Sequence, residues 1–244
     1  MPQPGSAIVV GVGPERGLGA VLASYFAKKG LHVFIAGRSE AKLQNVVQCI
    51  QKSGGSATSI VADITIAQNV SQLFDIVRER SDVVEIAAYN VDSNIPALFL
   101  EMNADTYTTL WQQNCLGAFL FSQEMVKIMQ AQRQGTLFFT GATASLRAKP
   151  PFTAFASAKA GLRALAQGLA REFSSQGIHV VHTVIDGVID GDRAHNQFPE
   201  YVKTKGKQGM LQLEAIAQTY WAIHQQPSSA WTHELDLRPF KEPF

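Results

Sequence analysis

A glycine cluster near the start of the chain constrains the fold more than any other feature. The apolar residues 8–10 run directly into it, and Gly13, Gly17 and Gly19 form the pattern G-x-x-x-G-x-G within it. Residues 20–30 follow with helix-forming composition and end in two lysines and a glycine. A strand, a tight turn and a helix in this order predict a diphosphate site. Glycines let the backbone approach the phosphates, and the helix N-terminus carries positive partial charge.

Strand and helix patterns alternate along the chain. Short apolar runs bounded by turn residues predict buried strands, and apolar residues three or four apart predict helices. The predicted strands cover residues 8–10, 32–36, 57–62, 83–88, 135–140, 178–185 and 231–237. The predicted helices cover about 17–30, 39–53, 70–77, 105–132, 155–176 and 213–224. This order predicts a single-domain, doubly wound (Rossmann) α/β fold with about seven parallel strands and helices on both faces.

We expect residues 1–244 to form one domain, because no linker-like tract interrupts the pattern. Residues 7–92 form its cofactor half. The predicted substrate-side loops are residues 140–155 and 186–212, and the second of these is irregular and polar enough to act as a lid.

Composition narrows the classes of partner. The formal net charge is +1, which gives no electrostatic reason to expect a nucleic acid or an anionic membrane. The two cysteines, Cys49 and Cys115, have neither a metal-binding nor a disulfide spacing. We also find no secretory signal and no apolar run of about 18 residues. We therefore expect a cytoplasmic protein that acts on a small molecule and carries no metal.

The end of the second predicted strand bears on the choice of nicotinamide cofactor. Enzymes that prefer NAD usually carry a carboxylate there, which binds the ribose 2′-hydroxyl. This chain has Arg38 followed by Ser39, and Arg16 lies in the glycine turn. A guanidinium pairs with a 2′-phosphate, so we expect NADP(H) to be preferred over NAD(H). Arg38 could instead be a solvated loop residue, and Asp63 could cap a helix as well as accept a hydrogen bond from the adenine amino group.

The chain resembles the short-chain dehydrogenase/reductase family. The resemblance rests on the glycine pattern at 13–19, Asp63 after the third strand, Asn114 in a long helix, and the segment Phe155-Ala-Ser-Ala-Lys159-Ala-Gly-Leu. It runs from residue 7 to about residue 187 and implies hydride transfer between a nicotinamide and a carbonyl or alcohol carbon. It also implies a homodimer or homotetramer that pairs the helices at 105–132 and 155–176.

The resemblance assigns the catalytic roles only in part. It implies that Lys159 binds the nicotinamide ribose and that Asn114 holds a helix bend and a water. Phe155, however, stands where the family has its catalytic tyrosine, and Ala142 stands where it has a serine. Phenylalanine keeps the ring but loses the dissociable proton. Thr143 is adjacent to the serine position and is the candidate hydroxyl, with Thr140 and Ser145 as alternatives.

The cofactor side matches the family better than the proton-transfer side. The residues expected to bind the cofactor are Gly13, Arg16, Gly17, Leu18, Gly19, Arg38, Ser39, Asp63, Ile64, Asn90, Lys159, Gly187 and Ile189.

Two functions remain open at this point. The first is an NADP(H)-dependent oxidoreductase acting on an unidentified carbonyl or alcohol. In it Lys159, water, Thr143 or a more distant group such as Tyr89, His195 or Tyr201 serves the proton. The second is an NADP(H)-binding protein with weak or no turnover, which acts as a sensor or as a subunit partner.

Overall fold

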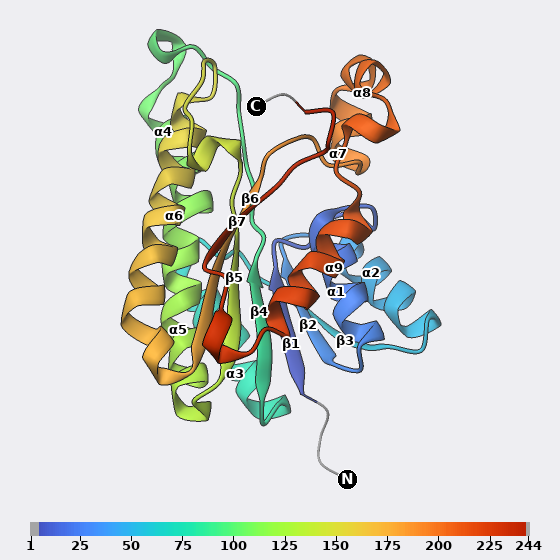
Figure 1. The fold of residues 1–244 in the computed structure, drawn as a ribbon, viewed down its shortest axis with the longest axis vertical. Coiled ribbons are helices and arrows are strands. Elements are labelled where there is room, and N and C mark those ends of the chain that lie inside the picture. The colour runs from blue at the N-terminus through green and yellow to red at the C-terminus, as the bar shows by residue number, and fades with distance from the viewer. Residues whose placement is uncertain (1–4, 243–244) are drawn as a thin grey trace.

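The computed structural model describes residues 5–242 and shows one sheet of seven parallel strands between two layers of helices (Figure 1). The strands are β1 (Ser6–Val10), β2 (His32–Gly37), β3 (Ser56–Val61), β4 (Val84–Tyr89), β5 (Gly135–Thr140), β6 (Ile178–Ile185) and β7 (Glu234–Leu237). The α-helices are α1 (Leu18–Lys28), α2 (Glu40–Lys52), α3 (Ala67–Arg80), α4 (Ala104–Trp111), α5 (Gly117–Gln132), α6 (Thr153–Phe173), α7 (Asp192–Gln197), α8 (Pro199–Lys205) and α9 (Leu213–His224). The shorter elements are a π-helical segment η2 (Gln112–Leu116) and 3-10 turns η1 (Phe99–Glu101), η3 (Thr143–Ser145), η4 (Ser174–Gln176), η5 (Lys207–Gly209) and η6 (Ser228–Ala230).

The strand order is β3-β2-β1-β4-β5-β6-β7, and every pairing is parallel. This confirms the predicted doubly wound α/β fold. The chain moves outward in one direction from β1 to β3 and then crosses back to β4 on the other side of β1. The order therefore reverses between β1 and β4, and a crevice opens at the carboxyl ends of these two strands.

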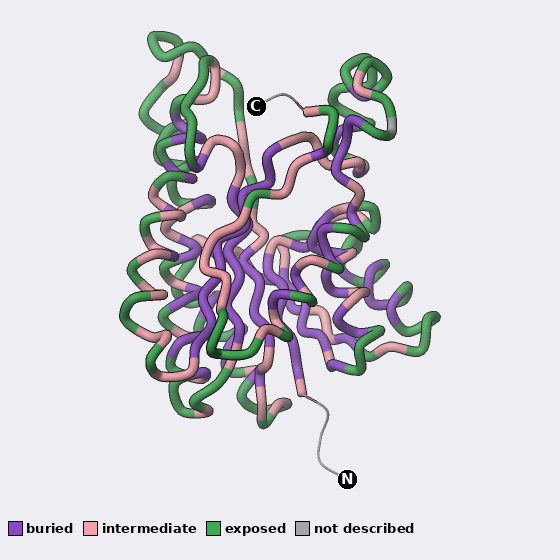
Figure 2. The backbone as a smooth tube through the Cα atoms, viewed as in Figure 1, coloured by how far each residue is buried: buried purple, intermediate pink, exposed green. Residues whose placement is uncertain are grey.

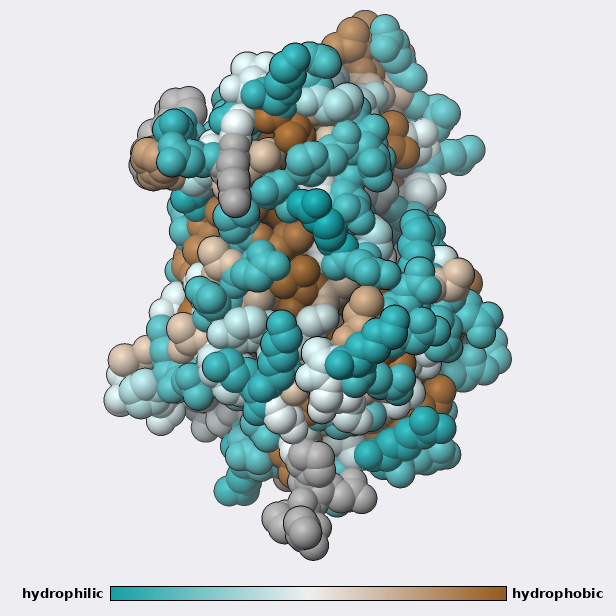
Figure 3. Space-filling view, turned by 90° about the vertical axis from the view of Figure 1, so that its right-hand side faces the viewer, coloured by the Kyte–Doolittle hydropathy of each residue, from teal (hydrophilic) through white to brown (hydrophobic). Residues whose placement is uncertain are grey.

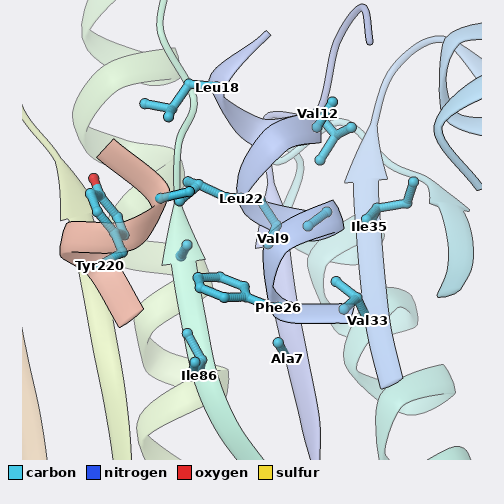
Figure 4. Packing of buried hydrophobic residues seen from close by; sticks show 14 of the residues in the cluster. Ala7, Val9, Val12, Leu18, Leu22, Phe26, Val33, Ile35, Ile86 and Tyr220 are labelled. Atoms are coloured by element: carbon cyan, nitrogen blue, oxygen red, sulfur yellow. The ribbon is translucent and has the colours of Figure 1, made fainter. Parts of the chain in front are cut away.

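Alternate residues of the buried strands supply two separate cores. In β1, Ala7 and Val9 face α1, α2 and α9, whereas Ile8 and Val10 face α3, α5 and α6. Phe26 of α1 and Tyr220 of α9 pack on the first face (Figure 4). Burial is thus concentrated in the strands and in the inner sides of the helices, as Figure 2 shows.

The structure differs from the predicted elements in three places. The expected lid at 186–212 contains two short helices, because Gly191 precedes α7 and Pro199 begins α8 with its fixed backbone angle. The predicted helix at 105–132 is divided by the π-helical segment. The last strand begins only at residue 234, because the backbone N–H of Thr232 donates to the side chain of Gln226. The domain prediction for 1–244 also includes residues 1–4 and 243–244, which lie outside the described residues.

Within residues 5–242, no helix combines the length and the apolar character that crossing a bilayer requires. On the face drawn in Figure 3, hydrophilic side chains predominate, and apolar side chains show between them near the middle.

Phe26 provides a direct test of the packing on the first face. Phe26→Ala removes a fully buried ring, so we expect the free energy of unfolding to fall by about 3–5 kcal/mol. Lys28→Ala, two residues later on the exposed side of the same helix, should change it by less than about 0.5 kcal/mol. Urea unfolding of both variants measures the difference, and similar losses in both would contradict this packing.

Candidate functional site

Two adjoining cavities occupy the crevice at the carboxyl ends of β1 and β4. The larger has a volume of about 580 Å³ and the smaller about 220 Å³. Both are lined by Gly11, Gly13 and Asp92, so they form one continuous cleft. The cleft runs from Arg38 at one end to Phe198 at the other.

The glycine turn forms the middle of the cleft and has two kinds of glycine. A Cβ on Gly19 would lie 2.9 Å from the carbonyl oxygen of Gly11, so the chain requires glycine there to pack on itself. A Cβ on Gly13 would meet nothing within 4 Å and would project into open space. Gly17 and Leu18 also line the larger cavity at the N-terminus of α1, whose first turn carries no acidic residue. Exposed backbone and a positive helix end suit a diphosphate.

The smaller cavity carries the residues predicted to select the nucleotide. Arg38, Asp63 and Ile64 line it. Asp63 Oδ1 accepts hydrogen bonds from the backbone N–H and the hydroxyl of Thr65 at 2.9 and 2.7 Å, which leaves Oδ2 without a partner among residues 5–242. Ser39 is exposed at the N-cap position of α2 and makes no capping hydrogen bond with its side chain.

Arg16 lies away from Arg38. It lines the larger cavity, and its guanidinium is 3.7 Å from Asp190 and 4.0 Å from Asp192. The prediction that Arg16 and Arg38 both bind the 2′-phosphate therefore stays a prediction. Arg38 alone lines the smaller cavity, where that phosphate is expected.

Lys159 is the most completely buried cation of the site, with 1% of its surface exposed. Its Nζ donates to the carbonyl oxygens of Thr140 at 3.0 Å and Val91 at 3.3 Å, and it lies 3.5 Å from Asp92 Oδ1. Burial lowers the pKa of Lys159, and the Asp92 carboxylate partly offsets that effect. Lys159 also lines the larger cavity, so it is not a surface lysine.

Asn114 lies in the π-helical segment, where the ordinary helix pattern is interrupted. Its Nδ2 donates to the carbonyl oxygens of Ser93 at 2.8 Å and Leu110 at 2.9 Å, and the side chain is fully buried. It thereby ties the bulge to the segment after β4. The structure places Asn114 at a bend of the helix but not in the cavity wall.

The positions of the family's tyrosine and serine both line the larger cavity. Phe155 is buried, and its ring centre lies 5.7 Å from Lys159 Nζ. Ala142 and Thr143 line the same cavity, and Thr143 Oγ1 donates to Asp186 Oδ1 at 2.6 Å. Ser145 is buried, and its Oγ accepts from the N–H of Ala142 at 3.1 Å. Thr143 is therefore the best-placed of the candidate hydroxyls.

The other candidate hydroxyl and proton donors are poorly placed. The hydroxyl of Thr140 is hydrogen-bonded to Tyr220 at 2.9 Å. Tyr89 is fully buried and donates to the carbonyl of Gln113 at 2.6 Å, and burial raises its pKa well above the ordinary value. His195 Nε2 lies 2.6 Å from Asp190, and Tyr201 lines a third cavity of about 490 Å³ rather than the larger one.

Of the remaining predicted cofactor residues, three line the larger cavity: Asn90, Gly187 and Ile189. Within residues 5–242, no group of three or more histidine, cysteine, aspartate or glutamate side chains could hold a metal ion.

Four charged residues of the cleft were not identified from sequence: Asp92, Arg147, Lys149 and Arg193. Arg193 of α7 bonds Asp92 at 2.6 Å and Asn94 at 3.0 Å, so it joins the lid to the segment after β4. The pair Arg147 and Lys149 in the loop at 140–155 was the one available signal. The sequence predicts that this loop lies on the substrate side, and the fold shows that these two side chains line the cavity.

Comparisons with known proteins agree with this fold. A family model described as short chain dehydrogenase matches residues 7–201. The crystal structure of a short-chain dehydrogenase from Rhodopseudomonas palustris is 34% identical, with a TM-score of 0.83, and covers 98% of this chain and 100% of that chain.

Two more distant relatives carry more specific names. A 3-oxoacyl-(acyl-carrier-protein) reductase from Synechocystis sp. is 26% identical over 185 residues, which are 75% of this chain and 74% of that protein. The structure of an actinorhodin polyketide ketoreductase with NADPH is 18% identical, has a TM-score of 0.87 and covers 97% of this chain and 96% of that chain.

Proposed function

Because the chain belongs to the short-chain dehydrogenase/reductase family of oxidoreductases, we propose that it transfers a hydride between NADP(H) and the carbonyl or alcohol carbon of a small molecule. The observation that carries this proposal is the continuous cleft, with the bare backbone of Gly13 in its middle and the buried amine of Lys159 in its wall. NADPH, when bound, supplies the hydride.

The residues of the cleft fit the parts of such a cofactor. The backbone of Gly13, Gly17 and Leu18 would hold the diphosphate at the N-terminus of α1. Asp63 would accept a hydrogen bond from the adenine amino group, and Arg38 would hold the 2′-phosphate. Arg38 has no hydrogen-bond or ion-pair partner among residues 5–242, so its guanidinium is available for that charge.

Lys159 and Thr143 are the residues that would act on the substrate side. Lys159 would bind the nicotinamide ribose, as the family resemblance implies, and its charge stabilises negative charge that develops on the carbonyl oxygen. Thr143 would orient that oxygen once its hydroxyl proton turns from Asp186 to the carbonyl. Because Phe155 offers no proton, the proton comes from Lys159 or from a water beside it. Burial helps here, since it lowers the pKa of Lys159 and so makes the ammonium a stronger acid.

We also propose a homo-oligomer that pairs the helices α4, α5 and α6 between subunits. Tyr107 and Trp111 of α4 and Phe119 of α5 leave 39–42% of their surfaces exposed. These large aromatic side chains supply apolar area that a second copy would cover.

The role of Arg38 predicts a reversal of cofactor preference. Wild-type protein should gain more thermal stability from NADPH than from NADH, and Arg38→Asp should invert that order. One charge-assisted phosphate contact is worth about 1.5–3 kcal/mol, or roughly tenfold or more in Kd. Lys28→Asp, an exposed position at the end of α1, is the matched control and should keep the wild-type order. Equal shifts with both cofactors in wild-type protein would contradict the assignment.

Phe155 predicts a gain of function. Phe155→Tyr should raise kcat for the NADPH-dependent reduction of aldehydes and ketones, by up to roughly 10², because a phenol beside Lys159 supplies the missing acid. Phe240→Tyr adds the same group at an exposed position that lines neither cavity and should leave kcat near the wild-type value.

The second candidate function is NADP(H) binding without turnover, and Phe155 is the observation that favours it. It would be the correct one if wild-type and Phe155→Tyr proteins both bind NADPH but neither consumes it with any aldehyde, ketone or enone.

A further inference from the structure

The substrate end of the cleft is cationic, and the cofactor needs none of this charge except that of Lys159. Arg147 and Lys149, from the segment between β5 and α6, line both the larger cavity and the adjoining cavity of about 490 Å³. Arg193 of α7 and the buried Lys159 line the larger cavity as well. Four cations from three parts of the chain therefore converge on one space.

Two carboxylates only partly balance these cations. Asp186 accepts hydrogen bonds from Thr143 Oγ1 at 2.6 Å and from Arg147 Nη2 at 3.0 and 3.2 Å, and it also ion-pairs with Arg238. Burial alone would raise the pKa of Asp186, but the Thr143 hydroxyl and the two arginines hold that pKa below its ordinary value. The carboxylate therefore stays ionised and balances one guanidinium.

The second carboxylate, Asp92, lies between Arg193 at 2.6 Å and Lys159 at 3.5 Å. Lys149 is exposed, and its side chain has no hydrogen-bond or ion-pair partner among the described residues. A third carboxylate on these walls, Glu242, is paired with Lys205 at 2.6 Å. The four cations therefore have only Asp92 and Asp186 to balance them, which leaves two positive charges in excess.

The excess lies at one end only. At the other end of the larger cavity, Arg16 faces two carboxylates, Asp190 and Asp192. Apolar side chains complete the wall near the cations, and they are Phe152, Phe155, Val188 and Phe198. A cationic end beside an apolar wall suits a molecule with an acidic group and an apolar body.

The position of Thr143 indicates how far the acidic group of the substrate lies from its reacting carbonyl. Its hydroxyl and the Arg147 guanidinium both contact the same oxygen, Asp186 Oδ1, at 2.6 and 3.2 Å. A carbonyl oriented by Thr143 therefore lies close to the cations. We propose that the substrate is a keto or aldehyde acid, whose carboxylate, a few bonds from the carbonyl, docks at Arg147 and Lys149.

This inference rests on the proposed NADPH-dependent reduction and deepens it. The carbonyl carbon takes a hydride and its oxygen a proton, so the product is the corresponding hydroxy acid. The cations also compensate in part for the absent tyrosine, because positive charge stabilises the developing alkoxide before that oxygen receives a proton.

The test compares acids with uncharged analogues of the same shape. Phenylpyruvate should be reduced with a kcat/KM about tenfold or more above that of its methyl ester. In Lys149→Glu the ratio of acid to ester should fall about fivefold, mainly through KM of the acid, because the charge at the mouth is reversed. Lys28→Glu, an exposed lysine of α1 outside these cavities, is the matched control and should keep the wild-type ratio.

A binding measurement separates this proposal from the proposed reaction. Calorimetry of the NADPH-saturated protein should show tighter binding of phenylacetate than of phenylacetamide, and weaker phenylacetate binding in Lys149→Glu. If the acid binds in this way but no carbonyl is reduced, the reaction is wrong and the anion site stands. If phenylacetate binds no better than phenylacetamide, or if the methyl ester is reduced as efficiently as phenylpyruvate, the anionic substrate is wrong.

Discussion

The cleft depends on bare backbone at the point where the strand order reverses. Gly19 must lack a side chain so that the turn can pack against Gly11, and Gly13 faces open space. The two glycines differ: a side chain at position 19 would collide with the protein itself, whereas a side chain at position 13 would collide only with a ligand. The open space beside Gly13, in a turn that otherwise packs tightly, leaves room for a group that approaches the backbone.

The two ends of the cleft differ in what they retain. The cofactor end keeps a phosphate-binding turn, an arginine and a buried lysine. The substrate end has Phe155 at the position of the family's phenol, and it carries the cations Arg147, Lys149 and Arg193. A site that lacks its strong acid must rely more on fixed charge and on the position of the substrate. A substrate with its own carboxylate would supply part of that positioning, so the absent phenol and the cationic wall are compatible.

The sequence alone predicted the strands, their parallel order and most of the helices, because apolar spacing is a local property. It also predicted that Gly13, Arg38 and Lys159 would lie along one cleft. It could not predict the pairing of Asp92 with Arg193, which are 101 residues apart in the chain, nor that of Thr143 and Arg147 with Asp186. The π-helical bulge at Asn114 was also missed as an element, since its residues have ordinary helix composition and only the hydrogen bonds to Ser93 and Leu110 show why the amide is there.

Calorimetric titration with NADPH of wild-type protein and Gly13→Val tests the central claim most directly. The Cβ of a valine at position 13 meets no protein atom within 4 Å, so the melting temperature without cofactor should change by no more than a few degrees. It would, however, occupy the space of the diphosphate, so wild-type protein should bind NADPH and the variant should bind at least about thirtyfold more weakly, a loss of about 2 kcal/mol. Equal affinity in the two proteins, or no binding by wild-type protein, would contradict the account.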